Sequence, residues 1–156
     1  MIEIVRTADL AAPPGAVWAA LSDFGAISAW AANVDHSCLM SEQVEGVGTA
    51  RRIQTGRTTV VERVLAWEPP STLSYEIEGL PSVVQSVTNT WHVYGTETGS
   101  RVSLTSRVDV GPRPPQKVIA RAIGRKLAQA SEVMLDGLTT RVATVPQDDD
   151  TGSVAA

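Results

Sequence analysis

The sequence predicts an α+β fold in which a curved antiparallel sheet of about seven strands grips one long C-terminal helix. Two observations lead to this prediction. Strand-like runs, several of them alternating apolar with polar residues, recur between residues 2 and 110, and one long helical pattern follows them. A sheet with one apolar face must be covered, and only this helix is long and amphipathic enough to cover it.

The first elements are a strand and two short helices. Ile2 to Leu10 is strand-like, and Pro13 and Pro14 end it, since proline lacks an N–H group but is tolerated in the first turn of a helix. A helical pattern covers Ala16 to Leu21 and stops at a Ser-Asp-Phe-Gly break. A second short helix is expected from Ala26 to Ala31.

A short strand and a hairpin follow. Val34 to Met40 has the composition of a strand, and two further strands, 49–54 and 57–67, flank Thr55-Gly56. This dipeptide is predicted to form the two-residue hairpin loop, because glycine adopts a positive φ easily. The sequence Glu-Pro-Pro-Ser after the hairpin ends the second strand.

Three more strands complete the predicted sheet. Residues 72–78 alternate apolar with polar side chains, and strands within 82–94 and 100–110 are joined by Gly-Thr-Glu-Thr-Gly. One face of the last strand carries arginine, serine, threonine and aspartate. That face is expected to meet solvent, which is typical of an antiparallel sheet with a single buried side.

The long helix is predicted from Pro115 to Ala143. Its apolar stripe consists of Ile119, Ala122, Ile123, Leu127, Ala130, Val133, Met134, Leu138 and Val142. Gly137 costs about 1 kcal/mol relative to alanine, so we expect it to permit a close approach to the sheet or to leave space for a ligand. Residues 1–145 then form a single domain, and 146–156 form an acidic tail predicted to be disordered.

The composition narrows the class of protein. The net charge of −4 argues against a nucleic-acid binder, which needs a basic face. Cys38 is the only cysteine, which excludes a disulfide framework and favours a cytoplasmic location. No apolar run is long enough to span a membrane. A monomer or a homodimer is expected, with no cofactor.

Four segments together resemble the START/SRPBCC superfamily, the helix-grip fold of polyketide cyclase/dehydrase-like proteins, plant abscisic-acid receptors and birch-pollen-type allergens. They are residues 12–30, 46–52, 60–77 and 99–106. The resemblance implies that the broken helix pair closes one end of the sheet, with Trp18 and Phe24 packing onto it and Trp30 near the next strand. It also implies a cavity between sheet and helix for an apolar or amphipathic small molecule.

The shared alternation of three strands and the helix stripe predict which residues line that cavity. These residues are Tyr75, Ile77, Val87, Trp91, Leu104, Val108, Ile123, Leu127 and Met134.

Glu62 is the strongest candidate for a polar residue that binds a ligand or takes part in catalysis. The expected loop pairs Arg51 with Val60 and Thr49 with Glu62, so Arg51 and Glu62 lie diagonally on one face. Periodicity leaves open which face of this strand is buried, because both faces are half apolar. The resemblance implies that Glu62 points into the cavity, where it would bind a ligand hydroxyl or act as a general acid or base. A structural Arg51–Glu62 pair and a solvated charge are the alternatives.

Three other polar side chains are candidates for ligand contact, namely Asn89, Ser106 and Tyr75. Asn89 lies on the predicted inner face and must find a partner, either a ligand or water, or else a neighbour such as Ser106 or Gln85. The Tyr75 hydroxyl is expected either to orient a ligand or to bond to the backbone of the core.

The two histidines give no support for a metal site or a catalytic triad. His92 is expected to point outward, while His36 points inward if Cys38 and Met40 do. Two distant histidines and one cysteine are a poor metal set, and no Gly-x-Ser-x-Gly elbow is present. The sequence therefore favours a carrier or sensor of a lipid-like or polyketide-like molecule. The alternative is a cyclase, aromatase or dehydratase that uses the same cavity, with Glu62 as its candidate catalytic group.

Overall fold

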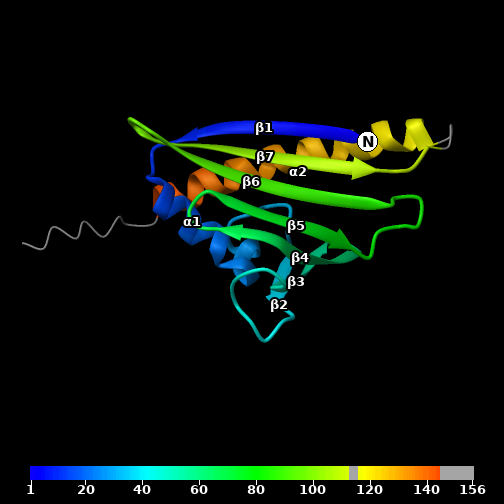
Figure 1. Ribbon diagram of the computed structural model, residues 1–156, viewed down its shortest axis with the longest axis horizontal. Helices are drawn as coiled ribbons and strands as arrows, with labels where there is room; N and C mark the ends of the chain where they lie inside the picture. The colour runs from blue at the N-terminus through cyan, green and yellow to red at the C-terminus, as the bar shows by residue number, and fades with distance from the viewer. Residues whose placement is uncertain (113–115, 145–156) are drawn as a thin grey trace, which may run out of the picture.

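The computed structural model describes residues 1–112 and 116–144, and the predicted α+β architecture is confirmed (Figure 1). The predicted acidic tail, 146–156, lies outside the described residues. The elements in order are β1 (Ile2–Leu10), α1 (Pro14–Ser22), η1 (Phe24–Ala29), β2 (His36–Leu39), β3 (Ala50–Thr55), β4 (Thr58–Glu68), β5 (Thr72–Glu78), β6 (Ser86–Thr96), β7 (Gly99–Asp109) and α2 (Gln116–Thr144).

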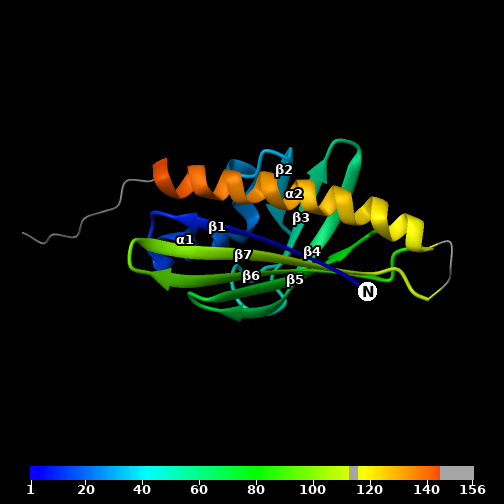
Figure 2. The same ribbon diagram turned by 90° about the horizontal axis from the view of Figure 1, so that it is seen from above.

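The seven strands form one antiparallel sheet in the order β1-β7-β6-β5-β4-β3-β2. The first strand therefore pairs with the last, from Ile2 opposite Val108 to Leu10 opposite Ser100. Helix α2 runs behind β1 and β7 along one side of the sheet, and the short elements α1 and η1 cover one end (Figures 1 and 2). This is the helix-grip arrangement that the sequence predicts.

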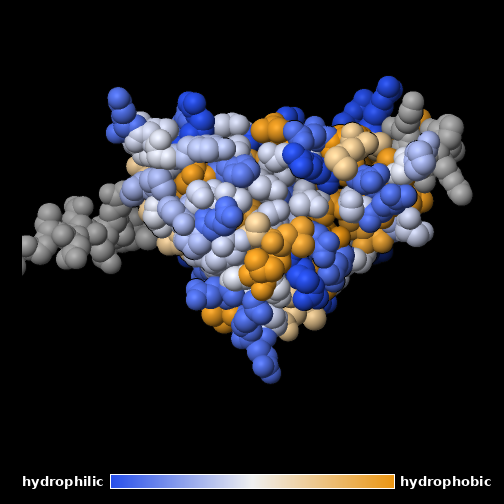
Figure 3. Space-filling view, viewed as in Figure 1, coloured by the Kyte–Doolittle hydropathy of each residue, from blue (hydrophilic) through white to orange (hydrophobic). Residues whose placement is uncertain are grey.

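The inner and outer faces of β6 and β7 follow the predicted alternation. Val87, Trp91, Leu104 and Val108 are buried on the inner face. The outer face carries cross-strand ion pairs such as Arg101–Asp9, at 2.8 Å between Nε and Oδ1. Figure 3 shows this face as mixed, with charged and polar side chains interspersed among apolar ones.

The hairpin register differs from the prediction. Thr55 pairs with Thr58, so the two-residue loop is Gly56-Arg57, and Arg51 lies directly opposite Glu62. Gly56 has φ of +58°, and no residue other than glycine has a positive φ among those described. A loop of Thr55-Gly56 would require threonine to take the first, left-handed position, which glycine accepts at far lower cost.

The ambiguous alternation of β4 has a structural cause. The register of β4 against β5 shifts between Val64 and Ala66, which is a β-bulge. Before the bulge Glu62 and Val64 are buried, and after it Trp67 packs against the core. Each predicted face is thus buried for part of the strand, because an extra residue reverses the side-chain alternation.

Helix α2 buries a stripe that differs in part from the predicted one. Met134, Leu138 and Val142 are buried as expected, but Ala122 and Val133 are exposed. Ala120, Ser131 and Leu135 are buried in addition to the predicted set.

The aromatic residues of the broken helix segment each meet an aromatic residue of the sheet edge-to-face. The pairs, with distances between ring centroids, are Trp18–Trp67 at 5.4 Å, Phe24–Tyr75 at 5.6 Å and Trp30–Trp91 at 6.1 Å. Edge-to-face packing of this kind stabilises a contact beyond its buried area. These pairs explain why a chain with few aromatics concentrates three of them here, and the predicted packing of Trp18 and Phe24 is confirmed.

Candidate functional site

A band of polar side chains crosses the inner face of the sheet, one from each of five adjacent strands. Its members are Arg51 on β3, Glu62 on β4, Tyr75 on β5, Asn89 on β6 and Ser106 on β7, and each is at most 6% exposed. Strand register places them side by side, since Arg51 is opposite Glu62, Tyr75 opposite Asn89, and Asn89 opposite Ser106. Because buried polar groups must be paired, their arrangement determines what this interior can accommodate.

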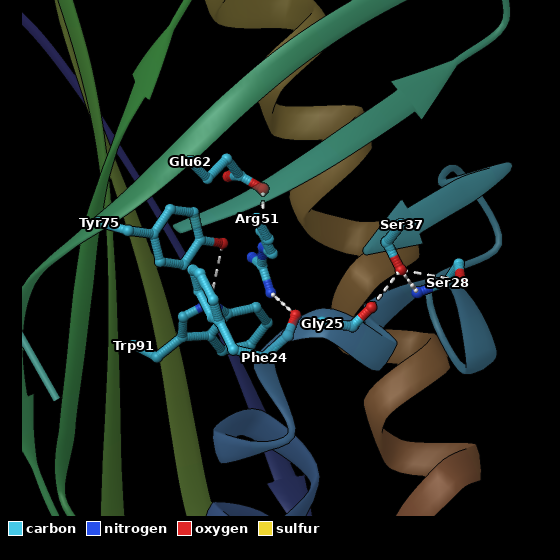
Figure 4. Close-up of polar contacts among 8 residues, drawn as sticks. All are labelled: Phe24, Gly25, Ser28, Ser37, Arg51, Glu62, Tyr75 and Trp91. Atoms are coloured by element: carbon cyan, nitrogen blue, oxygen red, sulfur yellow. Dashed lines mark hydrogen bonds and ion pairs between the residues drawn. The ribbon is translucent and has the colours of Figure 1, made fainter. Parts of the chain in front are cut away.

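At one end of the band, Arg51 and Glu62 form a buried ion pair (Figure 4). Arg51 Nε donates to Glu62 Oε1 over 3.1 Å, and Arg51 Nη1 donates to the backbone carbonyl of Phe24 over 3.0 Å. The pair therefore joins the hairpin to the start of η1. The expectation that Glu62 faces inward is confirmed, and the structural pair that the sequence left as an alternative is present.

Aromatic rings enclose the guanidinium group. Its central carbon lies 3.8 Å from the centroid of the Phe24 ring and 4.7 Å from that of Tyr75. Contacts of a cation with aromatic rings are favourable and offset part of the cost of burying the charge. The sequence predicts that Phe24 packs onto the sheet, but nothing in it indicates that the Phe24 ring and carbonyl contact Arg51.

Two side-chain hydrogen bonds hold the middle of the band. Trp91 Nε1 donates to the Tyr75 hydroxyl over 3.2 Å, and Ser106 Oγ donates to Asn89 Oδ1 over 2.7 Å. Burial, with the nearby Glu62 carboxyl as the next cause, raises the pKa of Tyr75 to about 12. Tyr75 therefore keeps its proton throughout the physiological range. Its partner is the Trp91 indole rather than the backbone.

The Glu62 carboxyl has a raised pKa. Its removal from water is the largest cause, and the charge and hydrogen bond of Arg51 oppose the rise without cancelling it. A buried carboxyl whose pKa is raised can hold or release a proton closer to neutral pH than an exposed one.

The polar band divides the apolar interior into two clusters. Asn89 lies between Val87 and Trp91 on β6, and Ser106 lies between Leu104 and Val108 on β7. Of the predicted cavity-lining residues, Tyr75, Trp91, Leu104 and Met134 belong to the first cluster, near α1 and η1, and Ile77, Val87, Val108, Ile123 and Leu127 belong to or pack on the second.

The second cluster is incompletely closed. Strands β5 and β6 pair only from Thr72 opposite His92 to Glu76 opposite Thr88. Beyond this point β5 stays with β4 while β6 stays with β7, and a hollow of about 240 Å³ opens between residues 76–80 and 84–87. Its lining is mixed, with Glu76, Glu78, Gln85 and Ser86 beside apolar residues. The apolar ones, Ile77, Leu80, Val84 and Val87, belong to or pack on the second cluster.

Gly137 permits a close approach of α2, but to the end of η1 rather than to the sheet. A Cβ atom at this position would clash with the backbone carbonyl oxygen of Trp30 and lie 3.5 Å from the Cα of Ala31. The lack of a side chain therefore allows this contact. Gly137 also lines a hollow of about 520 Å³ on this side of α2, together with Trp30 and Thr140.

The histidines take no part in the site. His36, Cys38 and Met40 are all exposed, so the condition under which His36 would face inward is not met. Strand β2 lies at the sheet edge and is short, which leaves its side chains uncovered. His92 lies within hydrogen-bonding distance of Thr72 on the outer face, as expected. Among residues 1–112 and 116–144 there is no group of three potential metal ligands.

These features place the protein in the helix-grip class. The sequence model of the family described as polyketide cyclase / dehydrase and lipid transport matches residues 1–143, and the chain belongs to this family. It is thus a member of the SRPBCC superfamily that its sequence resembles. No curated protein sequence matches the chain. No helix in the part of the chain that the structure describes is long and apolar enough to cross a membrane.

Solved structures share the fold at low sequence identity. A solution structure from Thermobifida fusca is 23% identical, with a TM-score of 0.77 over 92% of this chain and 94% of that one. The Zhui aromatase/cyclase from Streptomyces sp. R1128 is 14% identical, with a TM-score of 0.76 over 91% and 93%. Ara h 8.0201 is 12% identical, with a TM-score of 0.71 over 91% and 97%.

Proposed function

We propose that the protein binds an apolar or amphipathic small molecule between the inner face of the sheet and α2, as a carrier or sensor. The observation that carries this proposal is the open second cluster. Ile77, Leu80, Val84, Ile123 and Leu127 pack on its buried core while each keeps part of its surface exposed. A hollow beside partly exposed apolar side chains, with a few polar groups at its edge, is typical of ligand sites. Membership of the family supports the same proposal.

Native mass spectrometry of protein purified under mild conditions tests this function first, because a co-purifying organic molecule would appear as added mass. A second test uses N-phenyl-1-naphthylamine, a neutral dye that becomes fluorescent in apolar surroundings. Leu127→Gln places a polar group in the second cluster and should weaken dye binding, whereas Val118→Gln, at a position of the same helix that is 72% exposed, should not. Equal dye binding by both variants, or none by the wild type, would argue against the proposed site.

A cyclase, aromatase or dehydratase acting in the same interior is the second candidate. The observation in its favour is that Glu62, with its raised pKa, lies beside the Arg51 guanidinium and the Tyr75 hydroxyl. A carboxyl of this kind suits proton transfer, and the two donors suit a developing oxyanion. Turnover of a polyketide analogue that Glu62→Gln abolishes would support it. Binding without turnover supports the carrier or sensor.

A further inference from the structure

The Arg51 guanidinium has unused hydrogen-bonding capacity in the interior. Its Nε and Nη1 atoms donate to Glu62 and to the Phe24 carbonyl. Its Nη2 atom is buried and has no hydrogen-bond partner among the described residues, while the residue as a whole is 2% exposed. A guanidinium group has five N–H donors and cannot lose its charge. A buried Nη2 without a partner therefore costs free energy, and an acceptor placed beside it would remove that cost.

The Tyr75 hydroxyl is a second donor beside Arg51. Its oxygen accepts the Trp91 indole N–H, and the Asn89 side chain lies close enough to lower the pKa of this hydroxyl by hydrogen bonding. Among the described residues, no hydrogen bond found in the structure has the Tyr75 hydroxyl as its donor. Figure 4 shows the hydroxyl directed toward Arg51, whose guanidinium carbon is 4.7 Å from the centroid of the tyrosine ring. The Tyr75 side chain thus lies beside the guanidinium, where its O–H group is available as a second donor.

The charge balance indicates what kind of acceptor fits. The positive charge of Arg51 is already matched by the Glu62 carboxyl at 3.1 Å. The neighbouring Arg52 and Arg63 are exposed, on the other side of their strands. A carboxylate ligand would bring a second negative charge next to Glu62 with no further cation to balance it, which is costly away from water. A neutral oxygen accepts the same hydrogen bonds without that cost.

We propose that Arg51 Nη2, together with the Tyr75 hydroxyl, binds the carbonyl oxygen of a neutral, largely apolar ligand such as a ketone or an ester. This inference rests on the proposed binding function and names the chemistry of its anchor. Glu62 is then the group that holds the guanidinium in place, rather than the group that contacts the ligand. The aromatic rings of Phe24 and Tyr75 fix the plane of the guanidinium and so fix the direction from which the oxygen approaches.

Three naphthalene probes of similar shape test this proposal by displacing N-phenyl-1-naphthylamine. They are 2-acetylnaphthalene, 2-isopropylnaphthalene and 2-naphthoate. The ketone should displace the dye at a roughly tenfold lower concentration than the hydrocarbon. A hydrogen bond to a charged donor contributes enough binding free energy for a roughly tenfold or larger gain in affinity. The carboxylate should be the weakest of the three. The carbonyl stretching band of the bound ketone should also move to lower wavenumber.

The variants separate the anchor from the binding function. Arg51→Met/Glu62→Leu removes both charges together, keeps an apolar interior and should abolish the preference for the ketone while the hydrocarbon still binds. Arg52→Met, one residue away on the exposed side, should keep the wild-type preference. Failure of the wild type to bind the dye would overturn the proposed function. Dye binding with equal affinity for ketone and hydrocarbon, or with 2-naphthoate tightest, would overturn the anchor alone.

Discussion

Arg51 and Glu62 face each other across β3 and β4, and both side chains are almost entirely buried. The Arg63–Glu78 pair on the neighbouring strands has nearly the same length, 3.0 Å, but both of its side chains are more than 40% exposed. The two pairs therefore offer the same chemistry in two environments. Burial makes the first pair costly to break from one side, whereas the second is screened by water.

Removing Glu62 and removing Arg51 should lower the free energy of unfolding by different amounts. Glu62→Leu leaves a buried guanidinium that cannot neutralise itself, and we expect a loss of about 3–5 kcal/mol in the free energy of unfolding. Arg51→Met should cost less, because the remaining carboxyl can take up a proton. Urea denaturation of both variants and of Arg51→Met/Glu62→Leu measures this asymmetry.

The exposed pair is the matched control for that experiment. Arg63→Met and Glu78→Leu should each change stability by no more than about 1 kcal/mol. The buried double variant should recover much of what Glu62→Leu loses, since a well-packed apolar pair replaces an ion pair at little net cost. Equal losses in Glu62→Leu and Glu78→Leu would show that the Arg51–Glu62 pair is not buried as described.

The raised pKa of Glu62 gives stability a pH dependence of definite sign. A carboxyl with a higher pKa in the folded state binds more protons when folded, so its contribution favours folding at acid pH. This contribution is lost as the pH rises from the ordinary value of 4.5 through the higher folded value. The wild type should therefore lose stability relative to Glu62→Gln over that interval, as measured by urea denaturation at a series of pH values.

Asp9 provides a control of opposite sign. Its hydrogen bond with Arg101 lowers its pKa, so any stability it contributes is present above the ordinary value of 3.8 and is lost as the pH falls. Asp9→Asn should thus show its difference from the wild type growing toward neutral pH, though weakly, because the group is exposed. For Asp9→Asn, the wild type should gain stability relative to the variant as the pH rises. If the wild type also gains stability relative to Glu62→Gln as the pH rises, the pKa of Glu62 is not raised.

The faces of β6 and β7 could be predicted because a strand buried on one side must alternate, and both strands are regular. The position of Glu62 could not be predicted from periodicity, because the bulge after Val64 reverses the pattern within one strand. The partnership of Arg51 with the Phe24 carbonyl spans 27 residues of sequence. This contact depends on how η1 packs against the hairpin. Local residue patterns do not indicate that packing, so the contact could not be predicted.

The two helix glycines should respond in opposite ways to alanine. At Gly137 a methyl group would meet the Trp30 carbonyl oxygen, so Gly137→Ala should destabilise by about 1–3 kcal/mol despite the better helix propensity of alanine. At Gly124 the added methyl would lie 3.6 Å from Ile4 and 3.8 Å from Ile2, which is ordinary contact. Gly124→Ala should therefore stabilise by up to about 1 kcal/mol. Thermal unfolding of both variants measures the contrast, and a stabilising Gly137→Ala would show that α2 does not press on η1.

The Tyr75 hydroxyl should matter for stability even without a ligand. Tyr75→Phe removes the acceptor of the Trp91 indole N–H, which is buried and would be left unpaired at a cost of about 1–3 kcal/mol. Tyr94→Phe is the matched control, because Tyr94 is 54% exposed and its hydroxyl can be replaced by water at little cost. Urea denaturation followed by tryptophan fluorescence measures both variants, and Trp91 reports directly on the altered contact. If Tyr75→Phe is as stable as Tyr94→Phe, a buried water or another acceptor satisfies Trp91. The Tyr75 hydroxyl is then not held in the direction that the proposed carbonyl anchor needs.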